Sequence, residues 1–132
     1  MDLILDTHLI LWALVGSEKL PKDVKLLMAS PKNNIYFSIA SMWEVSIKHA
    51  KNKLPISGTE FFHYCEQAGF RHLAINDSHV LALETLHRES NAVRHKDPFD
   101  RILLAQAKSE CMQFFTHDVK FAEYNEPYVS IV

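Results

Sequence analysis

Short apolar runs alternate along the chain with longer segments in which apolar residues recur at helical spacing. The runs of strand length cover residues 2–5, 35–38, 71–75, 113–116 and 128–132. The segments with three- and four-residue spacing predict helices over residues 8–15, 21–29, 40–51, 57–68, 77–86, 98–108 and, briefly, 119–124. Strands that alternate with helices predict a parallel sheet covered on both faces, that is, a three-layer α/β/α sandwich.

Residues typical of helix ends support these boundaries. Gly16 is a favourable residue just beyond a helix, and Pro21 suits a first helical turn. Ser57 precedes Glu60 at the spacing of a capping box, in which each residue satisfies a backbone N–H near the other. The segment 88–96 is polar and has no regular period, so it predicts an irregular connection.

Length and composition are those of an ordinary globular domain. The chain has 132 residues, of which 48% are hydrophobic and 23% charged, and we expect one domain spanning residues 1–132. The start lacks the basic residues of a secretory signal, and no apolar run approaches the roughly 18 residues of a membrane span. Cys65 and Cys111 have no metal-binding spacing, so we expect buried thiols in a reducing cytoplasm and no membrane partner.

The overall charge gives no sign of a nucleic-acid partner, but the local charge leaves the question open. The net charge is −2 and the pI is about 6.4. Basic residues nevertheless gather in two places, after Glu44 (Lys48, Lys51 and Lys53) and around Asp100 (Arg94, His95, Lys96 and Arg101). They either form a solvated face or contact phosphates.

Four acidic residues follow short apolar runs or begin helices: Asp6, Glu44, Asp100 and Asp118. In an open α/β sheet, binding sites form outside the carboxyl ends of the parallel strands, so acids from separate segments converge there. Converging carboxylates repel one another unless a cation lies among them. A hard divalent metal is the simplest cation for oxygen ligands, and it favours phosphoryl chemistry.

Each acid also has a purely structural interpretation. Asp6 and Asp118 are suited to cap the helices that follow them. Glu44 precedes Lys48 by one helical turn, a common surface pair worth only a few tenths of a kcal/mol. The residues on either side of Glu44 are apolar, however, and a Glu in apolar surroundings needs a partner. We therefore favour the site for Glu44.

The acids of the Asp97-Pro98-Phe99-Asp100 segment receive different assignments. Asp97 followed by Pro98 is a typical helix start, so capping is its first role and the site its second. Asp100 falls in the first helical turn, where the helix dipole also favours an acid. It shares a helical face with Leu103 and Leu104, which directs it toward the core or a crevice.

Hydroxyl, imidazole and aromatic side chains accompany the acids. Three hydroxyls either orient a ligand and its waters or bond to the local backbone: Thr7, Ser38 and Thr116. Three histidines are weak candidates for general bases because their scatter gives no common geometry: His8, His95 and His117. Three large aromatic residues are expected in the core: Trp12, Trp43 and Phe99.

Four blocks of the sequence closely resemble the VapC-like toxins of the PIN domain family. They are DTHLILW (6–12), YFSIASMWEVSIK (36–48), HKDPFDRILLAQA (95–107) and THD (116–118). The blocks span nearly the whole chain and follow the order and spacing of the family. The segment 88–94 looks longer than is usual before the third block.

The resemblance implies an endoribonuclease that depends on Mg²⁺ or Mn²⁺ and serves as the toxin of a type II toxin–antitoxin pair. Its products carry a 5′-phosphate. The family's quartet of acids maps to Asp6, Glu44, Asp100 and Asp118. Positions beside the metal map to Thr7, Thr116 and Asp97. The resemblance also implies a PIN-like sandwich, a homodimer, an RNA substrate and a small antitoxin whose tail enters the acidic groove.

On this interpretation Asp6, Asp100 and Asp118 hold the metal directly or through water, and Glu44 completes the pocket. Arg101 and Lys48 are the candidates for contacts to RNA phosphates. Two rival hypotheses are a PIN-like scaffold that only binds a partner and a metal-dependent phosphatase. Stabilisation by metal separates an intact site from a scaffold.

Overall fold

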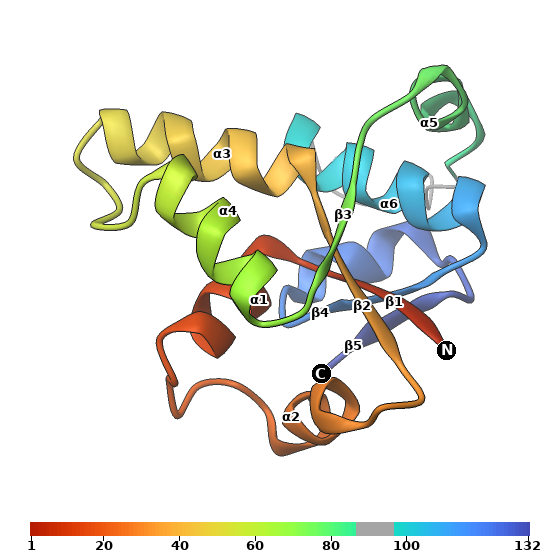
Figure 1. Ribbon diagram of the computed structural model, residues 1–132. Helices are drawn as coiled ribbons and strands as arrows, with labels where there is room; N and C mark the ends of the chain where they lie inside the picture. Colours follow the sequence, from red (N-terminus) through yellow and green to blue (C-terminus); the bar gives the residue numbers. More distant parts are fainter. Residues whose placement is uncertain (87–96) are drawn as a thin grey trace.

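The computed structural model describes residues 1–86 and 97–132 (Figure 1). In this part of the chain five parallel strands form one sheet in the order β3-β2-β1-β4-β5. The strands are β1 (Asp2–Leu5), β2 (Asn34–Ser38), β3 (Arg71–Leu73), β4 (Gln113–Thr116) and β5 (Val129–Ile131). All five lie within the runs predicted from the sequence or exceed them by one residue.

The helices also follow the expected order. The α-helices are α1 (Thr7–Leu14), α2 (Lys22–Ala29), α3 (Ile39–Ala50), α4 (Gly58–Gln67), α5 (Asp77–Ala82) and α6 (Pro98–Glu110). Two 3₁₀ helices are η1 (Leu83–Thr85) and η2 (Val119–Tyr124). The helix expected over residues 77–86 is therefore α5 followed by a tighter turn. The irregular connection expected over 88–96 lies outside the described residues.

Alternating side chains of the strands separate the core into two layers. Leu3 and Leu5 pack with residues of α1, α2 and α4 on one face of the sheet. Ile4 and Phe114 pack with α6 and η2 on the other face. Figure 1 shows these helices on opposite sides of the central strands. The three-layer α/β/α sandwich predicted from the sequence is confirmed.

The strand order reverses at β1. The chain runs from β1 to β2 and β3 on one side of the sheet, and β4 and β5 then add to the other side of β1. Loops after neighbouring strands diverge at such a reversal and leave a crevice at the carboxyl ends. The crevice therefore lies where β1 and β4 end, next to Asp6 and the segment 117–118.

Two expectations about burial are wrong. Cys111 is exposed, because it ends α6 in the left-handed conformation (φ 55°), whereas Cys65 is buried as expected. Trp43 is 59% exposed, because α3 turns a different face to the protein. That face comprises Ala40, Ser41, Glu44 and Val45.

Other local expectations hold. Ser57 and Glu60 form the capping box at the start of α4, and Gly16 lies just beyond α1 with φ 65°. Among the helices of residues 1–86 and 97–132, none is long and apolar enough to cross a bilayer.

Candidate active site

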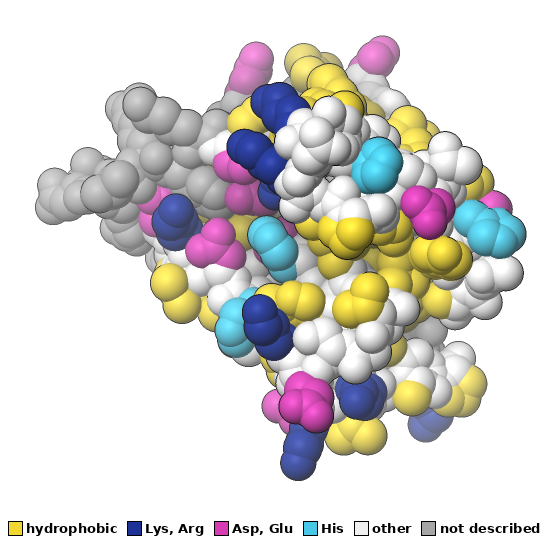
Figure 2. All heavy atoms as spheres, turned by 90° about the vertical axis from the view of Figure 1, so that its left-hand side faces the viewer, with side chains coloured by type: hydrophobic (Ala, Val, Ile, Leu, Met, Phe, Trp, Pro, Cys, Tyr) yellow, Lys and Arg dark blue, Asp and Glu magenta, His cyan; other side chains and the backbone are white. Residues whose placement is uncertain are grey.

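The ends of β1, β2 and β4 and the start of α6 bring the four acids to one side of the sheet. Asp6 directly follows β1, and Asp118 follows β4 by one residue. Glu44 lies in the second turn of α3, which begins where β2 ends, and Asp100 lies in the first turn of α6. Figure 2 shows the molecule from this side, where acidic side chains gather with histidine and basic side chains.

Asp6 is buried and held by hydrogen bonds to both carboxylate oxygens. The Thr7 N–H donates to Oδ1 over 2.8 Å, and the Thr116 hydroxyl donates to Oδ2 over 2.7 Å. Only 4% of Asp6 is exposed. The same carboxylate therefore caps α1, as one interpretation predicted, and its role in a site stays a prediction.

Asp118 is tied to the same threonine. Its N–H donates to the Thr116 hydroxyl over 3.0 Å, and its Oδ1 accepts the Lys120 N–H over 2.9 Å at the start of η2. Asp118 is less buried than Asp6 and keeps a capping role as well. The Thr116 hydroxyl thus fixes the two acids at the ends of β1 and β4 relative to each other.

Glu44 is buried with one of its two oxygens unsatisfied. Lys48 lies one turn along α3, and its Nζ is 3.0 Å from Oε2. The other oxygen, Oε1, is buried and has no hydrogen-bond partner among the described residues. A buried oxygen without a partner costs stability, so its retention indicates a place for a ligand.

Burial and the charges of the neighbouring acids both act on Asp100. Burial, followed by the charges of Asp6, Asp97, Glu44 and Asp118, raises the pKa of Asp100 to about 8. Burial also raises the pKa of Asp6, although the Thr116 hydroxyl, His8 and the Thr7 N–H act in the opposite direction. The four acids predicted from the sequence therefore act on one another electrostatically.

The residues fit a hard divalent cation that is held partly through water. The donors are carboxylate oxygens, which Mg²⁺ and Mn²⁺ prefer, and a cation would relieve the repulsion at Asp100 and the unsatisfied oxygen of Glu44. Within residues 1–86 and 97–132, no three His, Cys, Asp or Glu side chains stand close enough to hold one ion. Mg²⁺ commonly keeps several waters and takes one or two carboxylates directly, which suits this spacing.

Three further residues were expected near the acids, and the structure gives each a contact of its own. Asp97 caps α6 as predicted, because its Oδ1 accepts the N–H groups of Phe99 and Asp100. Arg101 points to Tyr124, with its guanidinium 5.9 Å from the ring centre and Nη1 3.4 Å from the hydroxyl. Lys48 is committed to Glu44. Phosphate contacts by Arg101 and Lys48 stay predictions.

The three hydroxyl residues also differ in what they touch. Thr116 contacts Asp6, as described above. The Thr7 hydroxyl instead lies 2.8 Å from the Ser41 hydroxyl, which links α1 to α3. The Ser38 hydroxyl donates to Oε1 of the buried Gln106 and caps α3. The structural interpretation therefore holds for Ser38, and Thr116 has the direct link to the acids.

A cavity of about 260 Å³ adjoins the acids at the ends of β1 and β4. Its lining residues are Asp6, His8, Trp12, His117 and Asp118. Trp12 packs against the core, as predicted, and also lines this cavity, whereas no common geometry was predicted for the histidines. The missed signal is that His8 and Trp12 are one turn apart on α1, directly after Asp6, while His117 precedes Asp118.

The PIN domain model matches residues 3–127. A search of curated proteins finds no match. Three similar solved structures share less than 20% sequence identity with this chain, so their similarity supports the fold alone.

These three structures cover nearly the whole chain. The crystal structure of VapBC2 from Rickettsia felis bound to a promoter DNA fragment matches with 17% identity, a TM-score of 0.68 and coverage of 100% of this chain and 98% of that one. VapBC-1 from nontypeable Haemophilus influenzae matches with 19% identity, a TM-score of 0.68 and coverage of 99% and 98%. FitAcB from Neisseria gonorrhoeae matches with 18% identity, a TM-score of 0.62 and coverage of 98% and 95%.

The fold and the site define an α/β/α protein with acids gathered at the carboxyl ends of its central strands. Within that class, the match over residues 3–127 is decisive: the chain belongs to the PIN domain family.

Proposed function

We propose that this protein is a metal-dependent endoribonuclease that hydrolyses RNA phosphodiester bonds and serves as the toxin of a type II toxin–antitoxin pair in the cytoplasm. The observation that carries the proposal is the convergence of four acids at one side of the sheet, where the buried oxygen Oε1 of Glu44 has no partner among the described residues. Burial first, and then the charges of Asp6, Asp97, Glu44 and Asp118, raises the pKa of Asp100 to about 8. Nucleases are a common activity of proteins with such acid clusters and a divalent metal.

Asp6, Asp100 and Asp118 would hold Mg²⁺ or Mn²⁺, directly or through water. When bound, the metal polarises the phosphate and lowers the pKa of water, which makes a nucleophile available at neutral pH. The residues of the chain hold the acids in position. Thr116 holds Asp6 and Asp118 in place, and Asp97 anchors the first turn of α6, on which Asp100 lies.

Glu44 is the candidate to position the attacking water. Its Oε2 is fixed by Lys48, and its Oε1 lies buried and unpartnered among the described residues. A carboxylate oxygen in that state accepts a hydrogen bond from water and so orients the water's lone pair. The ion pair with Lys48 holds the Glu44 side chain in place.

Two rival functions explain fewer observations. A binding scaffold has no need for the unsatisfied buried oxygen of Glu44 or for the repulsion at Asp100, both of which cost folding free energy. A phosphatase for small phosphoesters uses the same acids, so substrate tests must separate it from a nuclease.

The proposed partners rest on the family and on the similar structures, one of which is described as a toxin–antitoxin complex from Klebsiella pneumoniae. We propose a small cognate antitoxin for this chain, whose tail enters the acidic groove, and a homodimer. Co-expression with candidate antitoxins, followed by size-exclusion chromatography with light scattering, tests both assemblies.

The direct test of the activity uses purified protein and a single-stranded RNA. We expect cleavage with Mg²⁺ or Mn²⁺, no cleavage with EDTA, and no cleavage by Asp6→Asn or Asp100→Asn. A small phosphomonoester should not be hydrolysed. Hydrolysis of the monoester without cleavage of RNA would favour the phosphatase, and neither reaction would favour the scaffold.

A further inference from the structure

The cavity beside Asp6 and Asp118 combines three aromatic rings with two of the candidate metal ligands. We name it the ring pocket, after its lining residues Asp6, His8, Trp12, His117 and Asp118. We propose that the ring pocket receives one unpaired nucleobase of the RNA whose phosphate lies at the four acids. This inference rests on the proposed function and adds to it the recognition of a base next to the cleaved bond.

The position of the pocket supports a role in substrate binding. It lies at the carboxyl ends of β1 and β4, where the strand order reverses and ligands bind in open α/β sheets. Asp6 and Asp118 belong both to the pocket and to the acid group. A nucleotide whose phosphate is held at these acids by a divalent cation therefore has its base within reach of the pocket.

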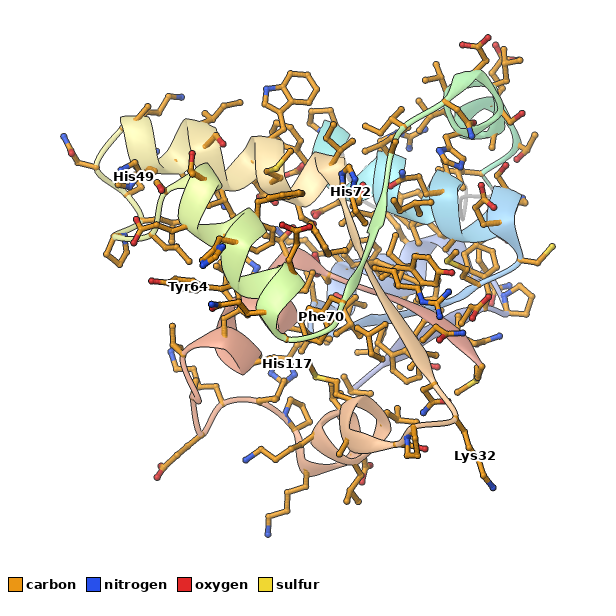
Figure 3. All side chains as sticks on the ribbon, in the orientation of Figure 1. Lys32, His49, Tyr64, Phe70, His72 and His117 are labelled. Atoms are coloured by element: carbon orange, nitrogen blue, oxygen red, sulfur yellow. The ribbon has the colours of Figure 1, made fainter. Side chains whose placement is uncertain are left out.

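The walls of the pocket suit a flat ring. The Trp12 ring lies edge-on to His117, with centres 5.4 Å apart and planes at 70°, and is 6.3 Å from the ring of His8. Trp12 is half-buried and so is held firmly, whereas both histidines are exposed and accessible. Figure 3 labels His117, which lies beside α1 at the end of β4. Bases stack on such rings whatever their sequence, for roughly 1–3 kcal/mol each.

The polar edge of the pocket suits the N–H groups of a base. Nδ1 of His117 contacts the main-chain oxygen of Val132. A main-chain oxygen only accepts, so Nδ1 is the donor in this bond, and whenever the ring carries a single hydrogen Nε2 can accept. The Asp118 carboxylate is a second acceptor. Amino and imino groups of a nucleobase are the complementary donors.

A base can enter the pocket only if it is unstacked and unpaired. A duplex would have to extrude the base at a cost of a few kcal/mol, so the pocket favours single-stranded RNA or loops. A larger groove of about 750 Å³ lies between α3, α4 and the segment after β3, but its lining residues include none of the four acids. The ring pocket is thus the better place for a base beside the cleaved phosphate.

Binding is tested without cleavage. The chain has two tryptophans, so Trp43→Phe leaves Trp12 as the sole tryptophan reporter, and Asp100→Asn prevents hydrolysis while metal is present. The probes are a short single-stranded RNA, a perfect duplex, and a series of single strands of the same sequence. Each member of the series lacks the base at one position. We expect saturable quenching of Trp12 fluorescence by the single strand, at least fivefold weaker binding when the abasic position falls at the pocket, and weaker binding of the duplex.

Variants assign the effect to the pocket. In the protein that keeps Asp100, we expect His8→Ala and Trp12→Leu to raise KM for intact RNA at least fivefold and to abolish the preference over abasic RNA. His63→Ala is the matched control, because His63 is an exposed histidine on α4 outside the pocket, and it should behave as the unaltered protein. His8 is exposed, so its variant should fold even if Trp12→Leu does not.

The outcomes separate this inference from the proposed function. If His8→Ala and folded Trp12→Leu keep both KM and the base preference while Asp100→Asn is inactive, the nuclease stands and the base pocket is overturned. If these variants impair binding of an antitoxin but not of RNA, the pocket belongs to a protein interface and the inference also fails. If RNA quenches Trp12 but is never cut, the pocket stands and the nuclease fails.

Discussion

Thr116 and Asp6 lie 110 residues apart in the chain and are joined by a 2.7 Å hydrogen bond, in which the Thr116 hydroxyl donates to Oδ2 of Asp6. The same hydroxyl accepts the N–H of Asp118. One side chain at the end of β4 therefore sets the position of an acid on each of the two central strands. The precision of the candidate site depends on this buried threonine.

We expect Thr116→Val to impair both stability and the site. The variant preserves the side-chain shape but leaves the Asp6 carboxylate without a donor, at a cost of about 1–3 kcal/mol. Loss of the donor should also raise the pKa of Asp6 further, because the Thr116 hydroxyl lowers it. Urea unfolding at neutral pH measures the cost. Thr116→Ser restores the hydroxyl and should recover most of it, and equal losses in the two variants would contradict the assignment.

Divalent metal should stabilise the protein. Mg²⁺ or Mn²⁺ relieves the repulsion among Asp6, Glu44, Asp100 and Asp118, and a ligand at a hundredfold excess over Kd adds about 2.7 kcal/mol if it binds only the folded state. Melting curves with metal and with EDTA measure the shift. Asp6→Asn and Asp100→Asn should reduce it. An unchanged Tm at millimolar metal would falsify a competent site.

Removal of the Asp100 charge should stabilise the metal-free protein at high pH. The folded state raises the pKa of Asp100 from 3.8 to about 8, so folded Asp100 keeps its proton to higher pH than the unfolded chain does. Its contribution to stability is therefore present below about pH 4 and is lost as the pH rises toward about 8.

Asp100→Asn abolishes this loss. In EDTA, the free energy of unfolding of the variant relative to the unaltered protein should rise by more than about 1 kcal/mol between pH 4 and pH 8, since one pKa unit corresponds to about 1.4 kcal/mol. Urea titrations at both pH values measure the difference. A constant difference would show that Asp100 ionises normally in the folded protein.

Asp97 should tolerate amide substitution. Its side chain accepts the N–H groups of Phe99 and Asp100, and Asn caps helices nearly as well as Asp. Asp97→Asn should therefore keep the fold and part of the RNA cleavage, whereas Asp97→Ala should lose about 1 kcal/mol of stability. Cleavage and unfolding assays on the pair test this. Complete inactivity of Asp97→Asn, as for Asp100→Asn, would make Asp97 a ligand rather than a cap.

Arg101 is predicted to contact RNA, although the structure places its guanidinium against Tyr124. Loss of the ring contact should cost about 0.5–1 kcal/mol of stability in Arg101→Ala. If Arg101 also binds one phosphate, the slope of log binding constant against log salt should fall by about one unit, with metal binding intact. Binding titrations at several salt concentrations measure the slope. An unchanged slope would show that Arg101 does not contact a phosphate.

The sequence predicted the fold well because its local signals agree with one another. The strand and helix periods, the capping box at Ser57 and the cap at Asp97 all recur in the structure within a few residues. Asp6 and Asp118 were predicted to lie together because residues that follow parallel strands meet at one edge of the sheet, and Thr116 does join them there. The role of the four acids in a site stays a prediction.

Tertiary packing decided the rest. Trp43 was expected in the core from its spacing, but α3 is rotated so that Glu44 and Val45 are buried instead. Cys111 was expected to be buried, but it lies where α6 ends. The ring pocket joins residues of α1 to the end of β4, and sequence spacing does not report a pairing between strands that are so far apart.

The central place of β1 in the sheet has a consequence for how the protein is made. β1 pairs with β2 on one side, but its other edge stays open until β4, more than a hundred residues later, has been synthesised. Such distant pairings form slowly because a long loop must close first. Asp6 and Asp118 therefore cannot meet on a growing chain until synthesis has passed residue 118. A nascent chain would therefore lack the assembled acid group until almost all of this sequence has been translated.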